Sequence, residues 1–335
     1  MLGFSFLPAA SHIVSAARHL AGLEHGRAPT GQCRVESAPA TLPTAIDRLG
    51  APASPITFRL WRPAPVVAPA GRPGGIGLSC AGMPPLLLYL PGNGAGREDA
   101  ATTSENLASH GYLVAALDDV ERNSAGDGLH FDFSSQETYA RMLQAADRKA
   151  DLQARRALRV LDSLAAGLEV PGLGLVRIDE TRIGAYGFSF GGASAAEAAT
   201  LDRRIAAAAN LDGWLFGRAA RGDLVQPYLL LMGDYAPLAP GNEADLTRRD
   251  LQEEARLGAR PGSAALRVAG AIHETFSDQI LRGSFAAAWL KADQHRLKAV
   301  IDACLLTFFD RHLRAGRGDF DVAACPELSP LRREN

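Results

Sequence analysis

Short apolar runs alternate along this chain with longer stretches that have a helical pattern. The run Leu86–Leu90 is apolar at every position, which is typical of a strand buried on both faces of a parallel sheet. Ile56–Trp61 alternates apolar and polar positions and predicts another strand. Further strands are expected at Tyr112–Leu117, Arg182–Phe188, Ile205–Leu211, Tyr228–Met232 and Ala265–Val268.

Helical patterns separate or follow most of these strands. They cover Thr103–His110, Ser135–Leu168, Ala193–Ala199, Glu243–Leu257, Phe285–Trp289 and Leu297–Arg314. Alternating strands and helices imply a mostly parallel central sheet with helices on both faces, and ligands then bind at the carboxyl ends of the strands. We therefore predict an α/β fold, and one domain that spans residues 56–335.

Residues 1–55 differ from the rest and predict an N-terminal arm or loop region that packs on this domain. Met1–Leu23 lacks the basic start of a signal peptide, and its mildly apolar pattern predicts a short amphipathic helix. Gly26–Pro55 is rich in Pro, Ala, Gly and Ser, which predicts an extended arm or loop on the surface.

Composition excludes several classes of partner. The chain has 335 residues and a formal net charge of -2, so we expect no nucleic-acid partner. No apolar run is long enough to span a membrane. The four cysteines neither require nor exclude an oxidising compartment, and they have no metal-ligand spacing; they are Cys33, Cys80, Cys304 and Cys325. The compartment stays open, with the cytoplasm favoured over secretion, and the oligomeric state also stays open.

One motif indicates chemistry. Gly187–Gly191 fits the pattern G-x-S-x-G, the nucleophile elbow, with Ser189 between a predicted strand and a predicted helix. The two glycines allow the turn to tighten, because a Cβ at either position would collide with the neighbouring strand or helix. A glycine-rich turn that only packs a helix on a sheet is the alternative interpretation.

A serine hydroxyl needs a base and an acid, which follow the serine along the chain in hydrolases of this kind. His273 lies downstream of Ser189, in a loop directly after the last predicted core strand, and is the expected base. Two carboxylates could orient it. Asp234 follows the strand that most such hydrolases use for the acid, whereas Asp212 follows the preceding strand. The pattern alone leaves both open.

A wider set of residues resembles the platelet-activating-factor acetylhydrolases of the plasma and intracellular type II kind, within the α/β-hydrolase superfamily. The similar segments are Gly92–Arg97, Leu107–Ala116, Gly187–Gly192, Leu211–Trp214 and His273–Asp278. In that family the acid follows the strand next after the nucleophile, so the resemblance implies Asp212. It also implies an oxyanion hole formed by the backbone N–H groups of Asn93 and Phe190.

The resemblance implies a serine carboxylic-ester hydrolase that cleaves short acyl esters, including the sn-2 acetyl group of phospholipids. We expect Phe188, Trp214 and Tyr235 to line the substrate pocket, and we expect no metal or organic cofactor. The family usually has a histidine at the position of Phe188, which leaves the acyl specificity open. The alternatives are a dienelactone-type hydrolase, an amidase, an acyltransferase, or a binding protein that keeps the fold without catalysis.

Overall fold

The computed structural model describes residues 29–43, 45–46, 52–64, 80, 82–120, 129–235, 238–282, 288–314, 320–325 and 327–331. The helix expected at 1–23 lies outside these residues. Within them, no helix is both long enough and apolar enough to cross a bilayer.

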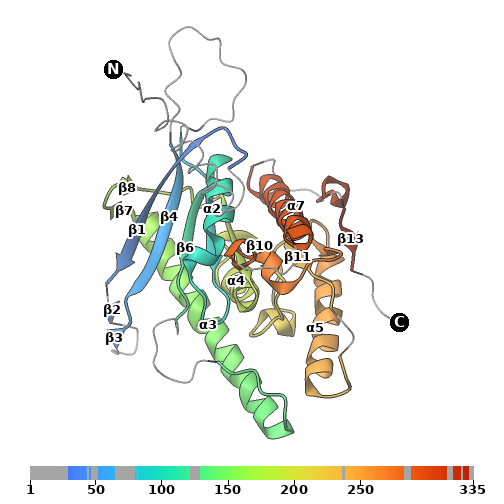
Figure 1. The fold of residues 1–335 in the computed structure, drawn as a ribbon. Coiled ribbons are helices and arrows are strands. Elements are labelled where there is room, and N and C mark those ends of the chain that lie inside the picture. Colours follow the sequence, from blue (N-terminus) through green and yellow to red (C-terminus); the bar gives the residue numbers. More distant parts are fainter. Residues whose placement is uncertain are drawn as a thin grey trace, which may run out of the picture.

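A nine-stranded sheet forms the centre of the described structure (Figure 1). Its strands lie in the order β1 (Arg34–Leu42), β4 (Ile56–Ala64), β6 (Leu113–Leu117), β5 (Leu86–Leu90), β9 (Ile183–Phe188), β10 (Ile205–Leu211), β11 (Tyr228–Met232), β12 (Ala264–Arg267) and β13 (Ser329–Pro330). Neighbouring strands from β6 to β12 are parallel, and β1, β4 and β13 add antiparallel edges. Every residue of β5, β6 and β9 is buried, as their apolar runs predict.

Helices cover both faces of this sheet. On one face α3 (Gln136–Ala166), α4 (Phe190–Leu201) and α5 (Asn242–Gly258) share a core with alternate residues of the strands, such as Leu88. On the other face α2 (Ala101–Ser109) and α7 (Ala288–Leu313) pack on residues such as Leu87. The predicted α/β fold is therefore confirmed. Because successive side chains of a strand point to opposite faces, both faces of the sheet need this cover.

Shorter elements complete the described chain. Two small hairpins pair β2 (Ala45–Ile46) with β3 (Pro52–Ala53), and β7 (Leu168–Val170) with β8 (Gly174–Val176). Single turns of helix are η1 (Arg97–Ala100), η2 (Ala219–Arg221), η3 (His273–Phe276), α6 (Gln279–Arg282) and η4 (Val322–Ala324).

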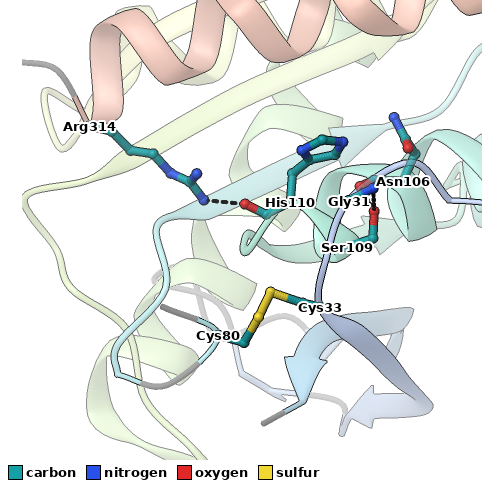
Figure 2. Close-up of a disulfide and its surroundings, with 7 residues drawn as sticks. All are labelled: Gly31, Cys33, Cys80, Asn106, Ser109, His110 and Arg314. Atoms are coloured by element: carbon teal, nitrogen blue, oxygen red, sulfur yellow. Dashed lines mark hydrogen bonds between the residues drawn. A yellow bond between two sulfur atoms is a disulfide. The ribbon is translucent and has the colours of Figure 1, made fainter. Parts of the chain in front are cut away.

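The arm predicted before residue 56 contributes a strand of the main sheet. β1 pairs with β4 along its whole length, and it buries Ala38 and Leu42 against the core. Figure 2 shows how the chain just before β1 is attached to the end of α2. A disulfide joins Cys33 to Cys80, and the backbone N–H of Gly31 donates to the Ser109 hydroxyl at 2.9 Å.

A second disulfide joins Cys304 of α7 to Cys325, so all four cysteines are paired. This bond holds the segment that contains η4 against α7. Disulfides persist in oxidising compartments and are rare in the cytosol. The pairing therefore weighs against the preference for the cytoplasm that the sequence suggested.

Candidate active site

Three side chains from separate parts of the sequence meet at the carboxyl edge of the parallel strands. Ser189 follows β9, Asp212 follows β10, and His273 begins the turn η3 after β12. The Nε2 atom of His273 lies 3.0 Å from the Ser189 hydroxyl oxygen. Its Nδ1 atom lies 2.7 Å from the Oδ2 atom of Asp212. This is a serine, imidazole and carboxylate in one hydrogen-bonded chain, which is the arrangement of a nucleophile, its base and the group that orients the base.

The turn at Ser189 is tight enough to require glycine on both sides. Ser189 has φ 55° and ψ −127°, a conformation that an L-residue rarely adopts and that holds its side chain at the apex of the turn. A Cβ on Gly187 would lie 2.0 Å from the carbonyl oxygen of Gly191. A Cβ on Gly191 would lie 2.0 Å from the carbonyl oxygen of Leu90. Both glycines therefore permit close backbone approach, which is the reason expected from the motif.

Asp212 is held firmly on a second strained turn, at φ 63°. Its Oδ1 atom accepts a hydrogen bond from the backbone N–H of Gly233 at 2.8 Å, and its side chain is 1% exposed. The hydroxyl of Tyr235 donates to Oδ2, the same oxygen that faces His273. Burial and the neighbouring carboxylate raise the pKa of Tyr235, so its hydroxyl keeps its proton. Both carboxylate oxygens are thus satisfied.

The alternative acid, Asp234, has other partners. Its Oδ2 atom accepts from the backbone N–H of Gly270 at 2.9 Å, and its Oδ1 atom lies 3.5 Å from the guanidinium of Arg267. These contacts hold the loop that follows β12. Asp234 therefore caps the loop before His273, whereas Asp212 faces the imidazole.

The loop of His273 is anchored to η1 and to the start of α2. Asp278 accepts a hydrogen bond from the backbone N–H of Thr102 at 2.7 Å, and its own N–H donates to the carbonyl of Asp99 at 2.8 Å. Burial raises the pKa of Asp278, and the ammonium of Lys298, 3.7 Å away, opposes that effect. The His273 side chain remains 41% exposed, so a ligand can reach the imidazole while its loop is held.

The two expected oxyanion donors belong to segments that adjoin the serine. Phe190 is the first residue of α4, where the backbone N–H groups have no partner within the helix. Asn93 lies in the turn after β5, and its preceding residue Gly92 passes close to the serine. A Cβ on Gly92 would lie 3.4 Å from the Cβ of Ser189. Backbone N–H groups from a loop and from a helix N-terminus beside a serine are the kind of donor that can receive a developing negative charge.

The three expected pocket residues occupy different environments. Phe188 is buried, and its ring centroid lies 4.7 Å from that of His273, so it supports the imidazole. Trp214 packs against two aromatic rings that the sequence did not indicate, with centroids 5.7 Å away at Phe131 and 5.9 Å away at Phe133. Tyr235 is 52% exposed beside Asp212. The two phenylalanines lie in the segment just before α3, and only the fold brings them to Trp214.

The sequence patterns also did not indicate a polar cluster that lies behind Asn93. The ammonium of Lys149 lies 2.5 Å from the Asn93 side-chain oxygen and 2.9 Å from Asp119. A weak signal was present in the sequence, because Lys149 and Gln153 interrupt the apolar face of α3, one turn apart. Within the described ranges, no group of three or more His, Cys, Asp or Glu side chains is arranged to hold a metal ion.

Comparisons with known proteins agree with this architecture. Residues 175–320, which include Ser189, Asp212 and His273, match the family described as platelet-activating factor acetylhydrolase, isoform II. Two curated relatives are platelet-activating factor acetylhydrolases. That of Cavia porcellus is 25% identical over 65% of this chain, and that of Bos taurus is 24% identical over 71%. The matches span 53% and 59% of the lengths of these relatives.

Among solved structures, a ferulic acid esterase from Streptomyces cinnamoneus superposes with a TM-score of 0.64 and 25% sequence identity. That match covers 91% of this chain and 98% of the other. Together these findings confirm the resemblance to the platelet-activating factor acetylhydrolases and the α/β-hydrolase fold.

Proposed function

We propose that this relative of the platelet-activating factor acetylhydrolases is a serine ester hydrolase whose triad is Ser189, His273 and Asp212. The observation that carries this proposal is the hydrogen-bonded chain from the Ser189 oxygen through the imidazole to a buried carboxylate, with distances of 3.0 Å and 2.7 Å. Ser189 sits on a strained turn at the start of a helix, as a nucleophile elbow requires.

The reaction follows from these positions. The Nε2 atom of His273 takes the hydroxyl proton as the Ser189 oxygen attacks the ester carbonyl carbon. Asp212 accepts the Nδ1 hydrogen bond and stabilises the imidazolium that forms. The tetrahedral intermediate collapses when the C–O bond to the alcohol breaks, and His273 gives its proton to the leaving alcohol. A water molecule, activated by the same imidazole, then attacks the acyl-enzyme and releases the acid and free Ser189.

The negative charge of the tetrahedral intermediate needs donors that are already in place. We assign this role to the backbone N–H groups of Phe190 and Asn93. Each donor of this kind typically contributes about 3 kcal/mol to stabilisation of the transition state. The position of Phe190 at the N-terminus of α4 adds the positive end of the helix dipole.

For the substrate we propose esters with short acyl groups, from acetyl to butyryl, including the sn-2 acetyl group of phospholipids. The resemblance to the acetylhydrolases supports this class. So does the bulk of Phe188 and Phe190, which flank the serine on both sides and are buried. No step of this reaction calls for a metal or an organic cofactor.

A second candidate is an esterase for aromatic acyl groups. Two observations favour it: the ferulic acid esterase matches nearly the whole chain, and Trp214, Phe131 and Phe133 form an aromatic cluster beside the turn of Asp212. A flat aromatic acyl group can pack edge-to-face or in offset stacking against such rings. Amide, lactone and acyl-transfer activities of the same fold remain further alternatives to hydrolysis of simple esters.

A panel of substrates tests these candidates. It contains p-nitrophenyl acetate, butyrate and palmitate, a phospholipid with an sn-2 acetyl group, methyl ferulate, p-nitroacetanilide and a dienelactone, with a free alcohol added to detect acyl transfer. We expect acetyl and butyryl esters to turn over fastest and Ser189→Ala to abolish that turnover. Faster cleavage of methyl ferulate would favour the second candidate, and faster cleavage of palmitate would contradict the short-acyl proposal. Absence of all activity together with no labelling by an organophosphate would contradict a serine hydrolase.

A further inference from the structure

A lysine is buried directly behind the loop that carries Asn93. Lys149 lies in the middle of α3 and is 5% exposed. Its ammonium donates to the side-chain oxygen of Asn93 at 2.5 Å, while the side-chain nitrogen of Asn93 donates to the backbone carbonyl of Leu129 at 2.9 Å. The Asn93 side chain is thus held from both ends, which fixes the orientation of the peptide that carries its N–H.

The same ammonium is paired with a buried carboxylate that holds the next residue of the loop. Asp119, at the carboxyl end of β6, lies 2.9 Å from the Lys149 ammonium, and its side chain is fully buried. Its Oδ2 atom also accepts the backbone N–H of Gly94. Its backbone N–H donates to the carbonyl oxygen of Ala95 at 3.2 Å. Lys149 and Asp119 therefore hold three successive loop residues from behind.

The network also reaches the other proposed donor. Gln153, one turn after Lys149 on α3, donates to the Oδ1 atom of Asp119 at 2.5 Å and accepts from the hydroxyl of Ser194 at 2.7 Å. Ser194 lies on α4, one turn after Phe190. The Lys149 ammonium itself lies 5.4 Å from the centroid of the Phe190 ring. One buried cation is therefore in contact with the loop and with the first residue of the helix.

A stabilising role alone does not account for this arrangement. A buried ion pair is costly to desolvate, and replacing it by apolar residues is often neutral or favourable for stability. What such a pair does supply is a defined geometry, because every hydrogen bond must be made in a dry environment. Here that geometry is imposed on the peptides at 93–95.

We propose that Lys149 and Asp119 are positioning residues for the oxyanion hole. They hold the Asn93 N–H at the distance from Ser189 at which it can receive the negative charge of the tetrahedral intermediate. This inference rests on the proposed function. A misplacement of about 1 Å in such a site costs on the order of a hundredfold in rate, which is the effect available to these residues.

Asn93→Ala gives the sharpest test, because it removes the side-chain anchor but keeps the backbone N–H and the Lys149–Asp119 pair. The concentration of active sites is first titrated with an organophosphate, so that misfolded protein does not count. We expect kcat per active site to fall about 10- to 100-fold with little change in KM, since the contact acts only on the charged intermediate. Binding of a trifluoromethyl ketone, which forms an oxyanion on the serine, should weaken by the same factor.

Lys149→Met breaks the same contact from the other side, and the double variant completes a cycle. We expect the loss in kcat for the double variant to be no larger than that of the stronger single variant, because both substitutions release one loop. Arg218→Met is the matched control. Arg218 pairs with Glu197, whose side chain is 1% exposed. Among the described interactions, the Arg218 guanidinium contacts Glu197 and Asp151 and no residue of the loop 93–95. This variant should lose thermal stability but keep its kcat per active site.

The outcomes separate the two proposals. If Asn93→Ala and Lys149→Met lower the melting temperature but leave kcat per active site and ketone affinity unchanged, the network is only structural and the inference is wrong. Additive losses in the double variant would likewise contradict a shared loop contact. If the parent protein is neither labelled by the organophosphate nor active on any ester, the proposed function itself fails.

Discussion

The backbone N–H of Ser189 donates to the carbonyl oxygen of Leu211 at 2.8 Å. The turn that carries the serine and the turn that carries Asp212 are therefore hydrogen bonded to each other. They also touch, because a Cβ on Gly213 would lie 1.9 Å from the carbonyl oxygen of Ser189. A carboxylate that follows β10 is thus coupled directly to the turn of Ser189, whereas a carboxylate that follows β11 lies one strand further away.

The first prediction concerns Ser189 and His273. Ser189→Ala and His273→Ala should each lower esterase turnover by several orders of magnitude, because the serine is a weak nucleophile without its base. The two losses should be strongly non-additive, since the residues act as one unit. Steady-state kinetics on p-nitrophenyl acetate measure both, and circular dichroism verifies that the variants are folded. A Ser189→Ala protein with parental activity would contradict the assignment of the nucleophile.

The second prediction separates the two acids. Asp212→Asn should lower kcat by about four orders of magnitude, because an amide favours the wrong imidazole tautomer and cannot stabilise the imidazolium. Asp234→Asn is the matched control and should cost less than tenfold, since its carboxylate contacts Gly270 and Arg267 instead of His273. Equal losses in both variants, or a larger loss at Asp234, would contradict the choice of Asp212.

The third prediction concerns a buried pair of carboxyl groups beneath the turn of Asp212. Glu254 and Asp250 lie one turn apart on α5, and Glu254 accepts hydrogen bonds from the Tyr228 hydroxyl at 2.9 Å and from Asn210 at 3.1 Å. Burial raises the pKa of Asp250 to about 8, and burial together with the Asp250 carboxylate raises that of Glu254. Near neutral pH, both carboxyl groups are therefore protonated in the folded state and ionised in the unfolded chain.

The sign of the effect follows from these shifts. A raised pKa in the folded state means that the stabilising effect of protonation is complete below about pH 4 and is lost as the pH rises toward about 8. Glu254→Gln keeps the acceptor for Tyr228 but cannot ionise. Its free energy of unfolding should decline less between pH 5 and pH 8 than that of the parent, as measured by urea denaturation at several pH values. A parallel decline in both proteins would contradict the prediction.

The fourth prediction concerns the disulfides. The Cys33–Cys80 bond closes a loop with a sequence separation of 47, and the Cys304–Cys325 bond closes one of 21. Removal of either bond by paired substitution to serine should lower the free energy of unfolding by about 2–4 kcal/mol, because cross-links restrict the unfolded chain. The contacts of the described residues link neither bond to Ser189, Asp212 or His273, so kcat of the folded fraction should stay unchanged. Thermal unfolding with and without reductant gives an independent measurement.

The sequence by itself determined most core strands and helices and the position of the elbow at Ser189. Continuous apolar runs such as Leu86–Leu90 can only be buried on both faces, and the alternation of these runs with helical patterns predicts the layered fold. The elbow at Ser189 is equally local, because its glycines and the flanking strand and helix are neighbours in the chain. His273 could be predicted from chain order, since few histidines follow the serine in a loop after a core strand.

The pattern along the chain left the acid open, because Asp212 and Asp234 both follow buried strands and have the same local signature. The resemblance implied Asp212, and only the tertiary structure shows that its carboxylate faces His273. The difference between the two aspartates arises from strand order and from the turn at φ 63°, neither of which a linear pattern contains. The same holds for β1, whose polar and proline-containing sequence becomes a strand because β4 offers it an unpaired edge. The contact between Lys149 and Asn93 is the clearest case. The two residues are 56 positions apart in sequence, and they meet only because α3 packs behind the loop of Asn93.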